Sequence, residues 1–436
     1  MSELPSGWAR TTLGTVADWG AGGTPSRSEP SFYGGKIPWI KSGELNTRYI
    51  KTTEESITEE AIKSSSAKIF PAGSVAIAMY GATIGKTAIL GIDASTNQAC
   101  AVGVPVEGII GNEYLYRLLQ NEKAAFIEKG KGGAQPNISQ AVIKAHEIGL
   151  PPLAEQTRIA VKLDELLAQV DTLKTRIDGI PALLKRFRQS VLVAAVSGEI
   201  SSTASARPML LSDICLSITD GDHQAPPQSN TGIPFITISA INDGVIRLEK
   251  ATRYVPTSYF EELKESRKPQ IGDILFSVTG SICIPAMVLS EQAFTFQRHI
   301  AILRPNPKLA LQKFLYFYLS SEQIRKQGLK VATGTAQLTV PLKGLRNFEI
   351  SLPTLEEQTE AVRRVEQLFA FADQLEAKVT SAKTRIDHLT RSILAKAFRG
   401  ELMPQDPSDE PASALLARIQ AQQDAASKTK RGRKST

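Results

Sequence analysis

The segment Gly81–Thr87 is the first part of the chain whose residue types could do chemistry. Its order, Gly-Ala-Thr-Ile-Gly-Lys-Thr, is similar to the loop that wraps backbone amides around a nucleotide phosphate, but that loop needs four residues between its glycines and only three are present. The matching segment Gly280–Pro285 has no lysine. We interpret Gly81–Thr87 as a turn that presents Tyr80, Thr83 and Lys86 to a ligand, and an enzyme that uses this turn on a nucleotide is one alternative.

Other catalytic signatures are missing or incomplete. Pro226-Pro227 lacks the Asn or Asp and the aromatic neighbours of an amino-methyltransferase site, and Glu262-Leu263-Lys264 has no partner aspartate placed for a nuclease, so we interpret it as a solvated helix face. The histidines and cysteines are scattered and form no metal-ligand spacing: His146, His223, His299 and His388; Cys100, Cys215 and Cys283. The sequence therefore predicts a non-catalytic chain with no metal or cofactor of its own.

Composition indicates a soluble globular protein of more than one domain. The chain has 436 residues, of which 42% are hydrophobic and 22% charged. It contains no run of about 18 apolar residues that could span a membrane, and its first residues lack the basic and apolar regions of a signal peptide. We expect a reduced, cytoplasmic protein.

The net charge of +7 is unevenly distributed. Residues 428–436 carry five basic and no acidic groups, whereas residues 1–149 have 14 of each and residues 207–350 have 16 basic and 12 acidic groups. A stand-alone DNA-binding protein usually has a clearer basic stripe. If the chain binds DNA, local patches or partner subunits must therefore supply the phosphate contacts. We interpret the tail as a solvated, disordered arm, with weak nonspecific DNA contact as the alternative.

One long segment occurs twice. Leu150–Thr157 (Leu-Pro-Pro-Leu-Ala-Glu-Gln-Thr) returns 202 residues later as Leu352–Thr359 (Leu-Pro-Thr-Leu-Glu-Glu-Gln-Thr), and the register holds until Ser197–Ile200 is matched by Arg399–Leu402. After each copy of the motif, apolar residues recur every three or four positions over four to five heptads. This pattern is typical of a coiled coil.

The two repeated helices are expected to pair with each other in antiparallel fashion, and a homodimerising zipper is the alternative. Gly179-Ile180-Pro181 predicts a kink or break in the first helix, while the second should run straight. About 48 residues at about 1.5 Å per residue would reach about 70 Å, the length of a spacer between modules. The residues expected to pack between the helices are Leu163, Leu166, Val170, Leu173, Ile177, Leu184, Val365, Leu368, Leu375, Val379, Ile386 and Leu389.

The segments before the two helices share a layout but few residues. Each has a strand after a glycine turn, a buried strand, a glycine-led loop, a glutamine before a further strand, one amphipathic helix and a final glycine-rich turn. The amphipathic helices are expected at 112–129, with Asn112 as N-cap, and roughly at 308–327. Loop lengths differ while the order of elements does not, and such loops commonly carry specificity.

These features together resemble the DNA specificity subunit of type I restriction–modification systems. The resemblance covers nearly the whole chain. Within the family, the helical regions of the chain are most similar to those of the enteric type IA group. It rests on Gly7-Trp8, Gly22–Pro25, Tyr33–Trp39, the doubled Leu-Pro-x-Leu-x-Glu-Gln motif, Leu183–Gln189, Arg363–Phe369 and Ser392–Leu402.

The resemblance implies an α+β chain with an internal pseudo-twofold repeat. Two similar mixed α/β target recognition domains, residues 1–149 and 201–350, would be separated by antiparallel coiled-coil helices at 150–200 and 351–402, followed by a C-terminal extension at 403–436. Each domain would read one half of a bipartite, asymmetric double-stranded DNA target. Two modification subunits, which bind S-adenosylmethionine and methylate adenine, would dock on the helices. Restriction subunits that use ATP and Mg would be optional further partners.

The family's base-reading residues form no fixed motif, so candidates come from position and chemistry. Lysine, glutamine and similar side chains on glycine turns can reach base edges or phosphates. The DNA-binding candidates are Lys41, Tyr80, Thr83, Lys86, Gln98, Gln135 and Asn137 in the first module and Thr279, Ser281, Gln297, Arg298 and Gln337 in the second. The alternative is that the chain is an interaction scaffold whose modules bind proteins.

Overall fold

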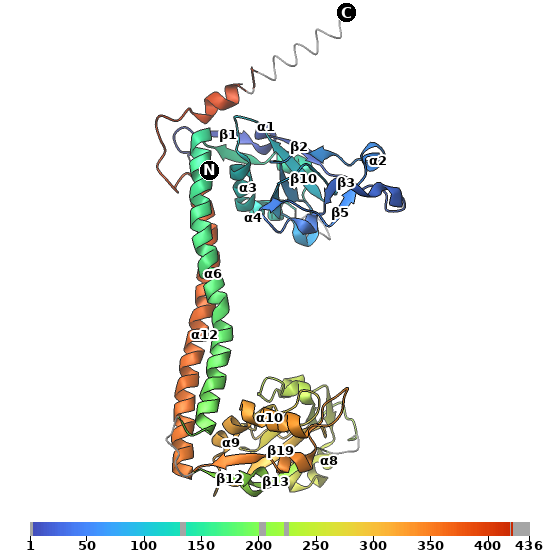
Figure 1. Ribbon diagram of the computed structural model, residues 1–436, viewed down its shortest axis with the longest axis vertical. Coiled ribbons are helices and arrows are strands. Elements are labelled where there is room, and N and C mark those ends of the chain that lie inside the picture. Colours follow the sequence, from blue (N-terminus) through green and yellow to red (C-terminus); the bar gives the residue numbers. More distant parts are fainter. Residues whose placement is uncertain (1–2, 131–136, 200–205, 222–225, 419, 422–436) are drawn as a thin grey trace, which may run out of the picture. The chain divides into compact units, whose positions relative to one another are not determined.

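The computed structural model describes residues 3–130, 137–199, 206–221, 226–418 and 420–421. The chain forms two compact units, and Figure 1 follows their elements along the sequence. The first unit takes residues 1–176 and 382–436, and the second takes residues 177–381. Among the described residues, no helix combines the length and apolar character needed to cross a membrane.

The first unit is built on a five-stranded sheet in the order β2-β10-β7-β8-β4, beside a four-stranded sheet in the order β5-β3-β9-β6 and a strand pair β1-β11. Its central strand β7 is buried throughout because all four of its residues are apolar. The elements are β1 (Ala9–Thr12), α1 (Leu13–Val16), β2 (Ala17–Ala21), β3 (Tyr33–Ile40), β4 (Tyr49–Ile50), β5 (Glu55–Ile57), α2 (Glu59–Lys63), β6 (Ile69–Phe70), β7 (Val75–Ala78), β8 (Thr87–Leu90), β9 (Ala94–Thr96), β10 (Cys100–Pro105), α3 (Asn112–Asn121), α4 (Lys123–Lys129), α5 (Gln140–Lys144) and β11 (Glu147–Leu150).

The second unit repeats this plan with four strands in its main sheet, in the order β13-β19-β16-β17. A three-stranded sheet, β15-β14-β18, and a pair, β12-β20, complete it. The elements are β12 (Arg207–Leu210), α7 (Leu211–Ile214), β13 (Cys215–Asp220), β14 (Ile233–Ile236), β15 (Arg253–Val255), α8 (Thr257–Glu262), β16 (Ile274–Ser277), β17 (Pro285–Met287), β18 (Thr295–Phe296), β19 (Ile300–Pro305), α9 (Gln312–Leu319), α10 (Glu322–Val331), α11 (Leu342–Arg346) and β20 (Glu349–Leu352).

The shared order of elements is confirmed, but the single amphipathic helix expected in each module is wrong. The first is divided into α3 and α4 at Glu122, and the second into α9 and α10 at Ser320-Ser321. The division in the second unit has a local cause, because the Ser321 side chain accepts the Ile324 amide and starts a new helix. Asn112 is also not the N-cap of α3, a position taken by Gly111.

The two long helices are α6 (Leu153–Val196) and α12 (Leu355–Phe398), and they pair with each other inside each unit. In the first unit an ion pair joins Lys174 to Asp387 at 3.8 Å. In the second unit Arg188 Nη2 lies 2.6 Å from Asp373 and 3.1 Å from Glu376. Lower numbers on α6 meet higher numbers on α12, so the helices run antiparallel.

The exposure of each side chain shows which of the residues expected to pack between these helices do so. Leu173 and Leu389 are 47% and 45% exposed, so the structure does not place these two in the seam. A straight helix drifts by about 20° per heptad relative to a strict seven-residue repeat, which moves some of the apolar positions out of the seam. The buried members are Leu163, Val170, Leu184, Val365, Val379 and Ile386, and the partly buried ones are Leu166, Ile177, Leu368 and Leu375.

Pro181 does not break the first long helix. Helix α6 continues through it from Leu153 to Val196, so it does not break at Gly179-Ile180-Pro181, and the kink expected there as the other outcome stays a prediction. Proline removes one backbone donor and clashes with the preceding turn. Contacts with α12 on the C-terminal side of the proline, which place Val191, Leu192 and Val365 in one buried cluster, stabilise the helix there.

A buried glutamine fastens each module to its long helix, and it is the Gln of the doubled motif. Gln156 accepts the Gly111 amide at 3.0 Å and donates to the carbonyls of Ile109 and Pro151 at 2.8 and 3.1 Å. Gln358 accepts the Leu311 amide at 2.7 Å and donates to the Leu309 and Pro353 carbonyls, both at 2.9 Å. Both glutamines are 1% exposed or less. The repeated motif therefore encodes a repeated clamp between the helix start and the loop before α3 or α9.

Next to the clamps, the two units use different chemistry. In the first unit Asp164 of α6 accepts hydrogen bonds from Arg48 and Arg117, both at 2.7 Å. Burial alone would raise the pKa of Asp164, but the hydrogen bonds from Arg48 and Arg117, together with the charges of these two residues, lower that pKa below its ordinary value. In the second unit the rings of Phe317 and Phe369 meet at 5.7 Å in an edge-to-face arrangement.

The glutamine clamp predicts a large loss of stability on substitution. Gln156→Leu leaves one amide and two carbonyls without their buried partner, so we expect the free energy of unfolding to fall by roughly 2–4 kcal/mol. Gln358→Leu should cost a similar amount in the second unit. Urea denaturation measures both, and Gln169→Leu, at an exposed position of α6, is the control. Equal stability of the clamp variants and the control would contradict the role of the clamp.

The ionic contact of the first unit predicts a salt-dependent and pH-dependent contribution. Asp164→Asn should lower the free energy of unfolding at neutral pH by about 1 kcal/mol, a value reduced for partial exposure, and by less in about 1 M NaCl. Because the pKa of Asp164 is lowered in the folded state, its contribution is present at neutral pH and is lost as the pH falls through that pKa. Glu366→Gln, at the position matching Asp164, removes only an exposed ion pair with Lys313 and should change little. A loss for Asp164→Asn that is independent of salt would contradict this interpretation.

Candidate nucleic-acid interface

In the first unit, the end of β7 lies between two other loops. The Met79 amide donates to the Ala99 carbonyl at 2.8 Å, and the Ile138 amide donates to the Met79 carbonyl at 3.0 Å. Tyr80 and Asn137 form a backbone bridge immediately beyond. The backbone thus brings the loops of three candidates, Tyr80, Gln98 and Asn137, to one edge of the sheet. Gln135 lies outside the described residues.

The turn after Tyr80 closes on itself. The amides of Ile84, Gly85 and Lys86 donate to the carbonyls of Gly81, Ala78 and Thr83. These amides are therefore not available to wrap a phosphate, which agrees with the rejection of a nucleotide loop. Both glycines adopt a positive φ, 59° at Gly81 and 74° at Gly85, which the tight turn requires.

The side chains of this turn make local contacts. The Thr83 hydroxyl donates to the Tyr80 carbonyl at 3.0 Å, and Lys86 Nζ donates to Asn46 Oδ1 at 2.7 Å. Tyr80 and Asn137 are exposed. Tyr80, Thr83 and Asn137 are therefore gathered at one place, with Lys86 at the far end of the same turn.

Lys41 and Gln98 lie on a neighbouring pair of segments, since the Asn97 amide donates to the Ile40 carbonyl at 2.9 Å. The Lys41 ammonium is held by Glu54 at 2.7 Å and Glu55 at 3.2 Å, and the hydrogen bond to Glu54 raises the pKa of Lys41. Any contact of Lys41 with a phosphate must therefore compete with two carboxylates. The Gln98 side chain accepts a hydrogen bond from the Thr24 hydroxyl.

The second unit repeats the same backbone arrangement. The Val278 amide donates to the His299 carbonyl at 2.9 Å, and the Val340 amide donates to the Val278 carbonyl at 2.7 Å. A backbone bridge joins Thr279 to Thr339, as Tyr80 is joined to Asn137. The two modules therefore build one site twice, with different side chains on the same backbone.

Three of the five candidates of the second unit line one open hollow beside this arrangement. Arg298 and Gln337 are exposed there, while Thr279 is buried and contacts the Thr339 hydroxyl at 3.4 Å. Ser281 is exposed outside the hollow, and its carbonyl accepts the Ser277 hydroxyl at 2.5 Å. The polar residues of the hollow are Asp220, Thr279, Arg298, His299, Gln337 and Thr339.

His299 and Thr339 were missed by the sequence interpretation. Gln297 Nε2 lies 2.8 Å from His299 Nδ1, so the fourth candidate contacts the hollow through this histidine. Burial lowers the pKa of His299, and the nearby Arg298 cation lowers it further. The available signal was sequence adjacency, because His299 directly follows Gln297-Arg298; Thr339 needed the backbone bridge to be recognised. Among the described residues, no group of three or more His, Cys, Asp or Glu side chains could hold a metal ion.

Comparison with known proteins gives one consistent result. Residues 5–182 and 211–382 match the family described as the type I restriction modification DNA specificity domain. The specificity subunit of the EcoKI type I restriction enzyme from Escherichia coli K12 is 32% identical, covering 100% of this chain and 99% of its own length. The StySPI specificity subunit of Salmonella potsdam is also 32% identical, at 99% of both chains. The crystal structure of the HsdS subunit from Thermoanaerobacter tengcongensis has the same fold, with a TM-score of 0.60 at 22% identity over 92% of this chain and 99% of that one.

The lowered pKa of His299 predicts a neutral imidazole at neutral pH. NMR titration of the histidine ring signals should give His299 a midpoint below 6.5, the ordinary value. Its depressed pKa means that its contribution to stability is present at neutral pH and is lost as the pH falls through the folded-state pKa. Arg298→Gln should raise the midpoint but leave it below 6.5, since burial is the larger cause. A midpoint at or above 6.5 in the unsubstituted protein would contradict the burial of the ring.

Proposed function

This chain belongs to the family of type I restriction–modification DNA specificity subunits, and we propose that it reads double-stranded DNA with both units. The observation that carries the proposal is the duplicated site, in which one backbone arrangement presents two different sets of side chains. The relatives are named as specificity subunits of restriction enzymes, so the chain recognises DNA and leaves catalysis to partner chains.

The differences between the two sites favour an asymmetric, two-part target. The first presents a phenol, an amide and the Lys86 ammonium; the second presents the Arg298 guanidinium, the Gln337 amide and hydroxyls of threonine. Base pairs are distinguished in the major groove by patterns of donors and acceptors, and arginine prefers guanine while amides prefer adenine. Two unlike sets of donors should therefore select two unlike half-sites.

The partners in this proposal are modification subunits docked on α6 and α12. On α6, Val161 and Val193 are exposed and lie two residues from the buried Leu163 and Val191, so each is roughly 200° around the helix from the seam. Each therefore leaves an apolar side chain on the outer face of α6, where a docked subunit would cover it. We propose two such subunits, which carry S-adenosylmethionine, with restriction subunits using ATP and Mg as further partners in the cytoplasm.

Single substitutions should alter one half of the target only. Arg298→Ala removes a guanidinium from the second site and Lys86→Ala an ammonium from the first, each at a cost of about 1–3 kcal/mol if it contacts a base. The measurement is the methylation rate of a panel of duplexes, with the modification subunit present. We expect each variant to relax discrimination in a different half-site. Variants that change the same half-site, or methylation that ignores duplex sequence, would overturn the proposal.

The helices should act as a ruler between half-sites. Adding one heptad to both helices at the unit boundaries, near residues 176 and 382, would lengthen the pair by about 10 Å, or about three base pairs. Methylome sequencing of cells that contain the variant should return the same two half-sites with a wider spacer. Insertion into one helix alone disrupts the pairing and should abolish methylation. An unchanged spacer in the double insertion would contradict the ruler.

A further inference from the structure

The main sheet of the first unit ends in a short strand that has no counterpart among the described residues of the second unit. Strand β4 runs parallel to β8, and the amides of Ile89 and Gly91 donate to the carbonyls of Arg48 and Ile50 at 2.7 and 2.8 Å. Arg48 also fixes this strand to the long helix through Asp164. The outward edge of β8 is therefore covered by the chain itself.

In the second unit, no described strand covers the corresponding edge at Met287 and Leu289, although Gly244 lies against the Pro285 carbonyl at the start of that edge. Strand β17 is the last of its sheet, and Val288 uses both its amide and its carbonyl on the inner side, with Asp273 and Gly272. Since strand residues alternate in direction, the amides of Met287 and Leu289 point outward. These two match Ile89 and Gly91, yet no acceptor for either amide is present in the described part of the chain.

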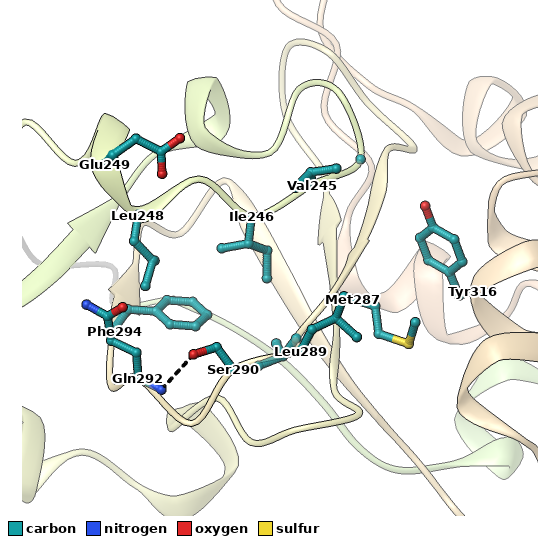
Figure 2. A pocket seen from close by; sticks show the side chains of 12 residues that line it. Val245, Ile246, Leu248, Glu249, Met287, Leu289, Ser290, Gln292, Phe294 and Tyr316 are labelled. Atoms are coloured by element: carbon teal, nitrogen blue, oxygen red, sulfur yellow. Dashed lines mark hydrogen bonds between the residues drawn. The ribbon is translucent and has the colours of Figure 1, made fainter. Parts of the chain in front are cut away.

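An apolar hollow lies beside this uncovered edge. Figure 2 shows Val245, Ile246 and Leu248 on one side of it and Met287, Leu289 and Phe294 on the other, with the ring of Tyr316 at one end. Val245 is 54% exposed and Leu289 is 74% exposed, so the rim is open. The hydrogen bond drawn in the figure runs from the backbone amide of Gln292 to Ser290 Oγ at 3.1 Å and holds the loop after Leu289 in a local turn.

In the second unit, residues 244–246 do not form a strand along this edge, because other contacts of the same segment hold them in a different conformation. Ile40 of the first unit corresponds to Ile236 of the second. Counting the same number of residues onward, Gly244 corresponds to Arg48, and Val245-Ile246 corresponds to strand β4. Gly244 has a φ of 77°, and its amide closes a turn on Ile241. The Arg247 amide donates to the Ala240 carbonyl, and its side chain donates to Asp243 at 2.8 Å.

We propose that the β17 edge and its hollow bind an extended, apolar peptide segment of a partner protein, which adds to the sheet as a parallel strand. Such strand addition obtains its affinity from main-chain hydrogen bonds and its selectivity from pockets for alternate side chains. The first unit shows what fits this place: a two-residue strand, Tyr49-Ile50, with the carbonyls of Arg48 and Ile50 accepting two edge amides. Glu249 lies at the rim, exposed and only loosely paired with Arg247 at 3.9 Å, so its carboxylate favours a basic residue beside the apolar ones. This binding does not depend on DNA reading.

A peptide copied from the first unit is the direct probe. A fluorescein-labelled peptide with the sequence of residues 46–52 (Asn-Thr-Arg-Tyr-Ile-Lys-Thr) is titrated with the full-length protein, and its anisotropy is measured. We expect saturable binding, whereas a scrambled peptide should not bind. Leu289→Pro removes one edge amide and should weaken binding by at least about tenfold, while Leu289→Ala keeps the amide and should weaken it by no more than about threefold. Val245→Asp, at an exposed rim position, should also abolish binding without disturbing the core.

Three outcomes of the titration would overturn the proposal. They are the absence of saturable binding, equal affinities of the proline and alanine variants, and tight binding by Val245→Asp. Hydrogen exchange of the free protein adds an independent check, since the amides of Met287 and Leu289 should exchange as fast as those of an open loop. Strong protection of both would show that the segment around Val245 covers the edge itself, and no partner strand would then be needed.

Discussion

The structure of each unit depends on one buried side chain, a glutamine at the start of a long helix. Gln156 and Gln358 are buried, and each makes three hydrogen bonds to backbone groups. A buried amide of this kind is stable only when its donors and acceptor are all matched, so it fixes the module and the helix in one relation. Because the clamp is duplicated, the two modules are held to their helices in the same way although few of their other residues agree.

This fixed frame allows the side chains at the sheet edge to differ. In both units the end of the central strand, β7 or β16, is hydrogen-bonded to the loop before β10 or β19 and to the segment before α5 or α11. Changes at the exposed Tyr80 or Arg298 can therefore alter the chemistry presented to a ligand while the backbone arrangement is kept. The first module carries equal numbers of basic and acidic groups, and its Lys41 is held by Glu54 and Glu55, which suits a reader whose phosphate contacts come from local patches or from partner subunits.

The sequence predicted the repeat, the paired helices and the order of strands, because these depend on periodicity and on long apolar runs. It did not predict the division of each amphipathic helix, since a local serine cap or a single turn residue decides that. The seam positions Leu173 and Leu389 were misjudged because a strict heptad ignores helix drift. The sequence alone did not indicate that Gln156 and Gln358 are buried and bind the loops before α3 and α9, since a glutamine in a helix is usually solvated. His299 and Thr339 join the second site only through contacts between loops distant in sequence.

Photo-crosslinking tests the central claim most directly, namely that each unit reads its own half of one target. A photoreactive side chain is placed at Tyr80 in one variant and at Gln337 in another, and each is assembled with the modification subunit and a duplex that carries the methylated sequence. The prediction is that the two positions crosslink to different half-sites, separated by a spacer that neither one contacts. Crosslinks from both positions to the same bases would contradict it, as would crosslinks distributed without regard to sequence.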